Sequence, residues 1–213
     1  MSLPIQSRSM RPALLLTALA ASTLLGACAP LLIGGAMIGG SMMVTDRRTS
    51  GTQLEDEGIE LKAARRADES IGERGHINLT SYNRLVLITG EVPTEADKAA
   101  VELAVARVEN VRSVVNELAI GSASSIGTRS KDTLLTSKVK ASMVDAKDVL
   151  TNAYKVVSER SVVYLMGRVS EREAGRATDI ARGVSGVTKV VRVFEIVSEA
   201  ELADAKAKPA AKP

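Results

Sequence analysis

The chain reads LVLITGEVPTEADKAA at residues 85–100 and VVYLMGRVSEREAGRA at residues 162–177. Each stretch begins with an apolar run typical of a strand, passes through a glycine, Gly90 or Gly167, and ends in residues typical of a helix start. Self-similarity of this kind indicates a repeated structural unit. The sequence therefore predicts two repeats. Because each glycine lies inside a strand, it is expected to mark a bulge or a close backbone approach.

A helix is predicted to follow each glycine-bearing strand. Thr94 with Asp97, and Ser170 with Glu173, have the spacing of a capping box, in which a hydroxyl and a carboxylate satisfy free backbone amides. The second pair is the better example because its third position is Glu. Apolar residues then recur at helical spacing and predict the buried faces, with Ala100, Leu103, Ala104 and Val108 in one repeat and Ala177, Ile180, Ala181 and Val184 in the other.

The remaining elements follow from the same alignment. The β-branched stretches at 111–120 and 187–197 predict closing strands, and extended stretches at 76–82 and 153–158 precede the glycine-bearing strands. Before these, helices are predicted to bury Ile59, Ala63 and Ala67 in the first repeat and Leu135, Val139 and Met143 in the second. Each repeat is therefore expected to run helix, strand, strand, helix, strand.

This order, the central glycine and the closing pattern of Val, two residues, Val resemble the BON domain, over about 54–120 and 130–197. The segment TDRRTSGTQLED, residues 45–56, is similar to the corresponding part of dual-BON outer-membrane lipoproteins, which are associated with division sites and envelope integrity in Gram-negative bacteria. The resemblance implies an α+β fold with two tandem BON domains, each αββαβ with a three-stranded mixed sheet packed by two helices. We place the domains at residues 52–121 and 129–198.

The strands at 85–89 and 162–166 are apolar almost throughout and do not alternate. A strand that is solvated on one face alternates, whereas a strand covered on both faces need not. The two repeats, or one repeat and the linker, are therefore expected to pack against each other. Two independent domains on a flexible linker are the weaker alternative.

An export signal precedes the repeats. Arg8 and Arg11 come before an apolar run at 13–25 that is too short to span a bilayer, so residues 1–27 are predicted to be a signal peptide. Residues 25–28, Leu-Gly-Ala-Cys, resemble the lipobox of bacterial lipoproteins, which makes Cys28 the expected lipidation site. Since Ala29 and not Asp follows, the resemblance implies export to the outer membrane, with the domains on its periplasmic face.

Two segments lie outside the predicted domains. Residues 28–51 are interpreted as a lipidated tether, and their Gly-rich stretch LLIGGAMIGGSMMV at 31–44 either lies on the membrane surface or forms a flexible linker. Residues 199–213 end in AKAKPAAKP and are predicted to be a disordered tail.

The composition argues against an enzyme and against nucleic-acid binding. One Cys and one His leave little for a Cys–His pair or a zinc site, and three Tyr, one Phe and no Trp offer few platforms for base stacking. We expect no enzymatic activity, no cofactor, no metal and no nucleic-acid partner. His76 has no acidic or cysteine neighbour in the sequence and is interpreted as structural or solvent-exposed.

Charge is divided unevenly between the repeats. Residues 52–120 contain 8 basic and 13 acidic side chains, whereas residues 128–198 contain 13 basic and 8 acidic ones. Each Lys or Arg near an anionic membrane is worth about 1 kcal/mol, so the second repeat is predicted to face anionic phospholipid. Leu134, between Lys131 and Lys138 on the first helix of that repeat, has the form of a shallow membrane contact, which Lys140, Val144 and Lys147 extend.

The resemblance supports this interpretation, because in dual-BON proteins the first helix of the second domain faces lipid. Two alternatives remain. The charged helix face is an ordinary solvated surface, or the protein is an interaction scaffold whose acidic first repeat docks a periplasmic or outer-membrane partner, such as an assembly machine or a regulator of cell-wall hydrolases.

Overall fold

The computed structural model describes residues 46–207. The first repeat contains α2 (Ser50–Ile71), η1 (Gly72–Arg74), β1 (His76–Tyr82), β2 (Leu85–Val92), α3 (Glu95–Ala106), β3 (Ser113–Asn116) and β4 (Ala119–Ile120). The second contains α4 (Ile126–Asp145), η2 (Thr151–Ala153), β5 (Tyr154–Glu159), β6 (Val162–Val169), α5 (Glu171–Gly183) and β7 (Lys189–Ile196). A last helix, α6 (Glu199–Ala207), follows. The predicted order of elements is confirmed in both repeats.

Each repeat forms a mixed sheet, as predicted. In the first, β2 pairs antiparallel with β1 and parallel with β3 and β4. In the second, β6 pairs antiparallel with β5 and parallel with β7. The closing strand of the first repeat is interrupted between β3 and β4, where Glu117 still donates its backbone N–H to the carbonyl of Ile88. The repeats therefore share one topology with a local difference at this strand.

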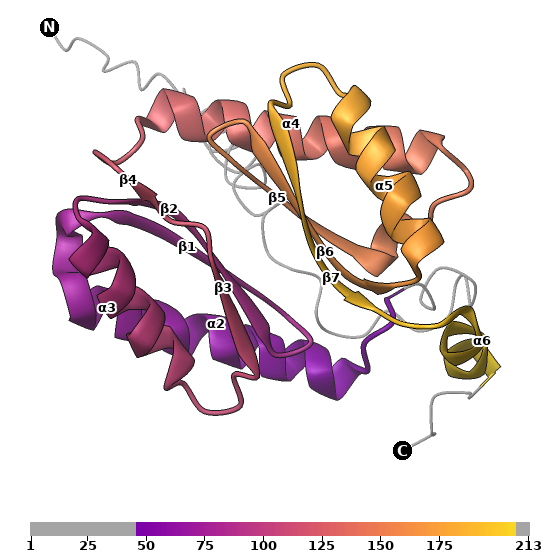
Figure 1. Ribbon diagram of the computed structural model, residues 1–213, viewed down its shortest axis with the longest axis horizontal. Helices are drawn as coiled ribbons and strands as arrows, with labels where there is room; N and C mark the ends of the chain where they lie inside the picture. Colours follow the sequence, from indigo (N-terminus) through magenta and orange to yellow (C-terminus); the bar gives the residue numbers. More distant parts are fainter. Residues whose placement is uncertain (1–45, 208–213) are drawn as a thin grey trace, which may run out of the picture. The chain divides into compact units, whose positions relative to one another are not determined.

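The two sheets face each other, and the helices cover their outer faces (Figure 1). Along β2, Val86 and Ile88 pack against α2 and α3, whereas Leu87 between them packs against the other repeat. The same alternation in β6 places Tyr164 and Met166 in the shared cluster with Leu87. Because both faces of each central strand are covered, the lack of alternation in the sequence is explained, and the predicted packing of the repeats is confirmed.

The strand glycines permit close contact between neighbouring strands. A Cβ atom on Gly90 would lie 1.9 Å from the carbonyl oxygen of His76, and Gly90 has a φ of +116°. A Cβ on Gly167 would lie 2.6 Å from the carbonyl oxygen of Ala153. The prediction of a close backbone approach is therefore confirmed at both positions, and only Gly90 also needs the backbone freedom of glycine.

Each repeat uses a buried aspartate of its first helix to hold the hairpin turn between its first two strands. Asp56 accepts hydrogen bonds from the backbone N–H groups of Asn83 and Arg84, each at 2.8 Å. Asp132 accepts hydrogen bonds from two turn amides of the second repeat, each at 2.9 Å. All four turn residues have positive φ, which a tight hairpin requires and which costs a non-glycine residue about 1–2 kcal/mol. The aspartates offset this cost.

The predicted buried face of the α3 region is wrong in part. The predicted Val108 is buried, but Leu103 is 53% exposed, and Val101 and Val105 are buried in its place. The sequence carries two overlapping stripes at helical spacing, and packing against α2 selects the valines. On α5 the predicted positions Ala177 and Ala181 are buried, and the capping box of Ser170 and Glu173 is complete. The Thr94 side chain also caps α3, by accepting a hydrogen bond from the backbone N–H of Asp97. The capping box is incomplete there, because the Asp97 carboxylate bonds to the Thr94 hydroxyl and not to its backbone N–H.

Two segments that the sequence assigns to a tether and a tail are ordered in part. The predicted tether extends to residue 51, but Arg47 and Arg48 already make buried ion pairs, and α2 begins at Ser50. The predicted disordered tail begins at residue 199, but α6 occupies Glu199–Ala207. This helix is ordered because Ser198 and Glu201 exchange capping hydrogen bonds and Leu202 is buried.

Candidate functional site

The residues predicted to contact lipid are all exposed. Leu134 and Val144 are 57% and 64% exposed on α4, the lysines on this helix are exposed at positions 131, 138 and 140, and Lys147 is exposed in the loop beyond its end. The predicted core positions Leu135, Val139 and Met143 are buried. The division of α4 into a buried and an outer face is confirmed, and its contact with lipid stays a prediction.

An uncharged stripe runs along the outer side of α4. It starts at Ile126, which is 78% exposed, and continues at intervals of three or four residues, the spacing of one helix face, through Ser130, Leu134, Ser137, Ala141 and Val144. Lys138 borders this stripe on one side. Lys140 lies two residues after Lys138 and is therefore about 200° further around the helix. It borders the stripe on its opposite side. We call these six positions and their bordering lysines the α4 surface.

The hydroxyl groups of the α4 surface are already hydrogen-bonded to the helix backbone. Ser130 donates to the carbonyl of Ile126 at 2.9 Å, and Ser137 donates to that of Thr133 at 3.1 Å. Thr133, beside the stripe, donates to the carbonyl of Arg129 at 3.0 Å. A buried polar group without a partner costs about 1–3 kcal/mol, so these internal bonds lower the cost of removing the surface from water.

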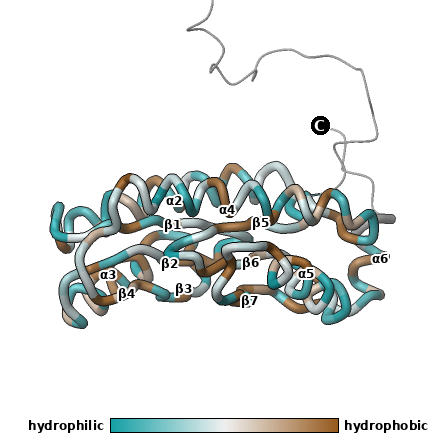
Figure 2. Tube along the Cα trace, turned by 90° about the horizontal axis from the view of Figure 1, so that it is seen from above, coloured by the Kyte–Doolittle hydropathy of each residue, from teal (hydrophilic) through white to brown (hydrophobic). Residues whose placement is uncertain are grey.

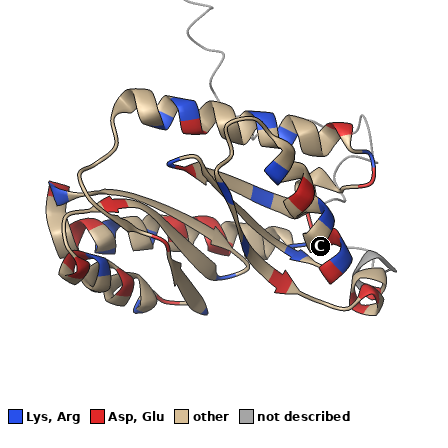
Figure 3. Ribbon diagram, turned by 45° about the horizontal axis from the view of Figure 1, so that its top comes forward, with Lys and Arg blue, Asp and Glu red and all other residues tan. Residues whose placement is uncertain are grey.

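Carboxylates are absent from the outer side of α4 over most of its length. Among the helix residues, which the structure describes in full, the acidic ones are Asp132, buried under the hairpin turn, and Asp145, the last residue. Figure 3 shows Lys and Arg at several points along this helix, and Figure 2 shows apolar positions recurring between polar ones. The α4 surface is therefore apolar along its centre and basic at its borders.

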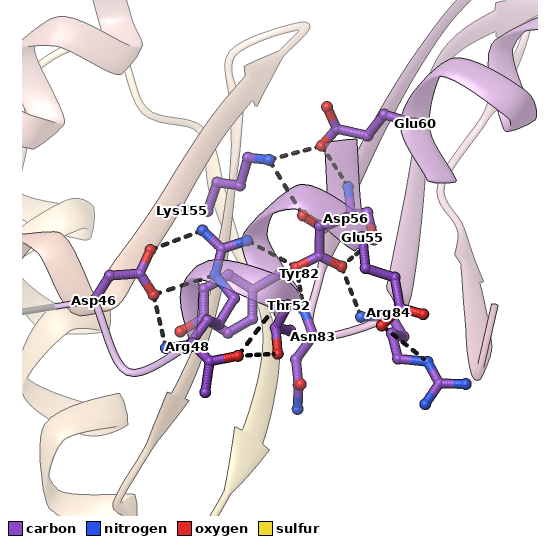
Figure 4. A network of polar contacts seen from close by, with 12 residues as sticks. Asp46, Arg48, Thr52, Glu55, Asp56, Glu60, Tyr82, Asn83, Arg84 and Lys155 are labelled. Atoms are coloured by element: carbon purple, nitrogen blue, oxygen red, sulfur yellow. Dashed lines mark hydrogen bonds and ion pairs between the residues drawn. The ribbon is translucent and has the colours of Figure 1, made fainter. Parts of the chain in front are cut away.

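A second group of interacting side chains lies in residues 46–49, which we call the lead-in segment. Arg48 lies between Asp46 and Asp56, with its guanidinium carbon 4.4 Å from the centre of the Tyr82 ring (Figure 4). Burial alone would raise the pKa of Asp56, but hydrogen bonds from Ser81, Arg84, Arg48 and Asn83 lower it below its ordinary value. The lead-in segment is thus fixed to the first repeat.

The lead-in segment also reaches the second repeat. Arg47 donates two hydrogen bonds of 2.7 Å to the carboxylate of Glu173 and a third to the carbonyl of Arg168. The hydrogen bond from Arg47 lowers the pKa of the Glu173 carboxyl. Sequence reasoning missed this pair, because it joins residues 126 positions apart and no local pattern relates them.

A third group lies where the two sheets meet. His76 Nδ1 lies 3.3 Å from Glu91 Oε2, and one nitrogen or oxygen atom each of His76, Glu91 and Glu159 lies within 4.8 Å of the other two. His76 has no acidic neighbour in the sequence, but the folded chain places Glu91 beside it. The available signal was the register of the predicted hairpin, which places His76 opposite Glu91.

The predicted signal peptide (1–27), the predicted lipidation site Cys28 and the Gly-rich stretch (31–44) lie outside the described residues. Within residues 46–207, none of the helices has both the length and the apolar character needed to cross a bilayer. The attachment of the protein to a membrane through Cys28 stays a prediction.

Comparison with known proteins agrees with the fold. The BON domain profile matches residues 56–122 and 131–198. The outer membrane lipoprotein DolP of Haemophilus influenzae is 38% identical over 179 residues, covering 83% of this chain and 92% of the relative. A 21 kDa hemolysin of Actinobacillus pleuropneumoniae is 32% identical over 154 residues, covering 71% and 79%. The osmotically-inducible protein Y of Escherichia coli is 35% identical over 97 residues, covering 43% and 48%.

These matches confirm the predicted relationship, and similarity to DolP over most of both chains agrees with the predicted outer-membrane location. The two matched segments coincide with the two αββαβ units of the structure. The chain therefore belongs to the BON-domain family and, within it, to the outer-membrane lipoproteins that carry two such domains.

Proposed function

We propose that this lipoprotein, tethered through Cys28, binds anionic phospholipid through the α4 surface of its second BON domain and thereby supports the integrity of the outer membrane. The observation that carries the proposal is the exposed stripe that includes Ile126, Leu134 and Val144, bordered by Lys138 and Lys140, on a helix whose opposite face is fixed in the core. Apolar residues enter the headgroup region while basic residues bind the headgroups. This role requires no nucleophile and no cofactor.

The expected binding energies fit a membrane contact that depends on the lipid tether. Each lysine near an anionic surface contributes about 1 kcal/mol, and apolar burial adds about 25 cal/mol per Å². A few such residues bind weakly when the protein is free in solution. A lipid anchor keeps the domain at high effective concentration near the bilayer, where a weak contact is occupied for much of the time. The α4 surface would then set the orientation of the domains on the membrane.

Vesicle co-sedimentation tests the proposal. Residues 45–213, which lack the anchor, include every helix and strand of both domains and are mixed with neutral or phosphatidylglycerol-containing vesicles. We expect pelleting with the anionic vesicles, reduced at high salt and lost in the double variant Leu134→Asp with Lys138→Glu. The matched control is Leu61→Asp with Lys62→Glu, an exposed pair on α2 of the first domain.

The control should pellet as the unchanged protein does. Equal pelleting with neutral and anionic vesicles, unaffected by the α4 variants, would rule out lipid binding through this helix. Loss of pelleting in both double variants would show that the overall charge of the protein, and not the α4 surface, drives the association.

A protein-interaction scaffold remains a second candidate, favoured by a specific feature of the first domain. Leu54 and Leu61 are exposed on α2 and lie seven residues apart, so they share one face of this acidic domain. An apolar pair with acidic surroundings fits a basic protein partner. Leu54→Asp with Leu61→Asp should then impair envelope integrity in cells while vesicle binding persists. Unchanged integrity in that variant would count against the scaffold.

A further inference from the structure

Three potential metal ligands from both domains, two of them buried, come together at the boundary between the two sheets. Glu91 on β2 is 2% exposed, Glu159 on β5 is 4% exposed, and His76 at the start of β1 is partly buried beside them. One ligand atom from each lies within 4.8 Å of the other two. Two carboxylates that approach each other in a buried place repel, unless a cation or a shared proton lies between them.

One oxygen of this cluster has no hydrogen-bond partner. Asn78 donates to Glu159 Oε2 at 2.7 Å, but within residues 46–207 no donor reaches the buried Glu159 Oε1. The buried hydroxyl oxygen of Ser124, whose backbone N–H donates to Glu91 Oε2 at 3.0 Å, likewise finds no partner in that range. Buried polar atoms are rarely left unpaired, so the free oxygen of Glu159 points to a ligand that would fill the position.

The carboxylates are oriented by neighbouring amides in the way that metal ligands commonly are. Asn78 fixes one oxygen of Glu159, and the backbone N–H of Ser124 fixes one oxygen of Glu91. In both carboxylates, the second oxygen, Oε1, has no amide donor among the residues that the structure describes. Hydrogen bonds to the outer atoms of a ligand hold it in position and are a regular part of metal sites.

We infer that His76, Glu91 and Glu159 bind a divalent transition-metal ion, for which Zn²⁺ is the appropriate probe, and that this ion joins the two BON domains. One imidazole and two carboxylates suit Zn²⁺ better than Mg²⁺ or Ca²⁺, which prefer oxygen ligands alone. Bonds of about 2.1 Å place tetrahedral ligands about 3.4 Å apart, so the side chains need only a small inward movement. A solvent molecule occupies the fourth position.

The site is accessible from solvent. Glu91, Ser124 and Arg160 line one open pocket, and Glu159 and Arg160 line a second. Arg160 Nε lies 3.9 Å from Glu91 Oε1, and its side chain is half-exposed. Because it is held loosely, Arg160 can move away when a cation enters. The ion would add a direct bond between β2 and β5, so it stabilises the docked arrangement of the two domains.

The chain contains a single histidine, which gives an unambiguous readout. Full-length lipoprotein in detergent micelles, labelled with ¹⁵N at histidine and stripped of metal with a chelator, is titrated with Zn²⁺. We expect a large shift of one ring nitrogen of His76 at stoichiometric zinc, together with a rise in the midpoint of thermal unfolding. The inference is overturned if the ring signals do not change up to a large excess of Zn²⁺.

Variants separate this site from non-specific binding. Glu159→Gln keeps the shape of the side chain and removes its charge, and it should raise the zinc dissociation constant at least about tenfold. Glu109→Gln, a matched change at an exposed carboxylate, should leave it unchanged. Equal zinc affinity in Glu159→Gln and the unmodified protein would also overturn the inference. A proton shared between the carboxylates would then explain why the two are buried together. If Glu159→Gln does not fold, the histidine titration of the unmodified protein decides alone.

Discussion

Arg47 and Glu173 are joined by two parallel hydrogen bonds of 2.7 Å, although 126 residues separate them. Arg47 lies in the lead-in segment, just before α2, and Glu173 lies in the first turn of α5 in the second BON domain. Both side chains are largely buried. The lead-in segment is therefore fixed to the domain that carries the α4 surface.

Replacement of Arg47 by alanine should lower the free energy of unfolding by about 1.5–3 kcal/mol, because it leaves a buried carboxylate without its cationic donor. Urea denaturation at neutral pH measures the change. Arg66→Ala, which removes an exposed ion pair with Glu69, is the matched control and should cost less than about 1 kcal/mol. Equal costs for the two variants would mean that the Arg47 pair adds nothing beyond a surface contact.

The same pair makes stability depend on acid pH. Its hydrogen bond lowers the pKa of Glu173 in the folded protein, whereas an unfolded Glu titrates near about 4.3. The contribution is therefore complete above about pH 4.3 and is lost as the pH falls through the lower pKa of the folded state. Between about pH 6 and about pH 3, the unmodified protein should lose more stability than Arg47→Ala. Parallel losses in the two proteins would contradict this linkage.

Gly90→Ala should destabilise the protein by at least about 2 kcal/mol, because the new methyl group would clash with the carbonyl of His76 and the backbone conformation is unfavourable for alanine. Gly58→Ala is the control. Gly58 lies inside α2, and a methyl group added there would meet open space, so the same change should stabilise by about 0.5–1 kcal/mol. Thermal unfolding of both variants measures the difference, and two changes of the same sign would contradict it.

Asp132→Ala should cost about 1–3 kcal/mol, because two partly buried amides of the hairpin turn lose their acceptor. A second change, Arg160→Gly, should restore part of the loss, since glycine adopts the positive φ of this turn without strain. Chemical denaturation of the single and double variants tests this coupling. Strictly additive effects would show that Asp132 does not act through the turn.

Much of the fold could be predicted because its determinants are local or repeated. The central glycines, the cap formed by Ser170 and the core spacing of α4 are all encoded within a few residues, and each is found in the structure. The apolar strands also indicated that both faces of the sheets are covered. A duplicated pattern strengthens such predictions, since the pattern that predicts each element occurs in both repeats.

The errors occurred where distant packing decides between local options. On α3, two stripes were equally compatible with a helix, and contact with α2 buried Val105 and exposed Leu103. The end of the chain has few apolar residues, so the burial of Leu202 could not be expected from composition. His76 and Glu159 meet only after the two domains dock, and no pattern within one repeat contains both.

Tryptophan fluorescence can report lipid contact at the α4 surface directly, because the chain contains no tryptophan of its own. Leu134→Trp, at an exposed position of the α4 surface, introduces a single fluorophore, and Leu61→Trp does the same at an exposed position of the first domain. With phosphatidylglycerol-containing vesicles, we expect a blue shift and protection from a water-soluble quencher at position 134 and neither effect at position 61. Equal exposure to quencher at both positions in the presence of these vesicles would show that the α4 surface does not bind lipid.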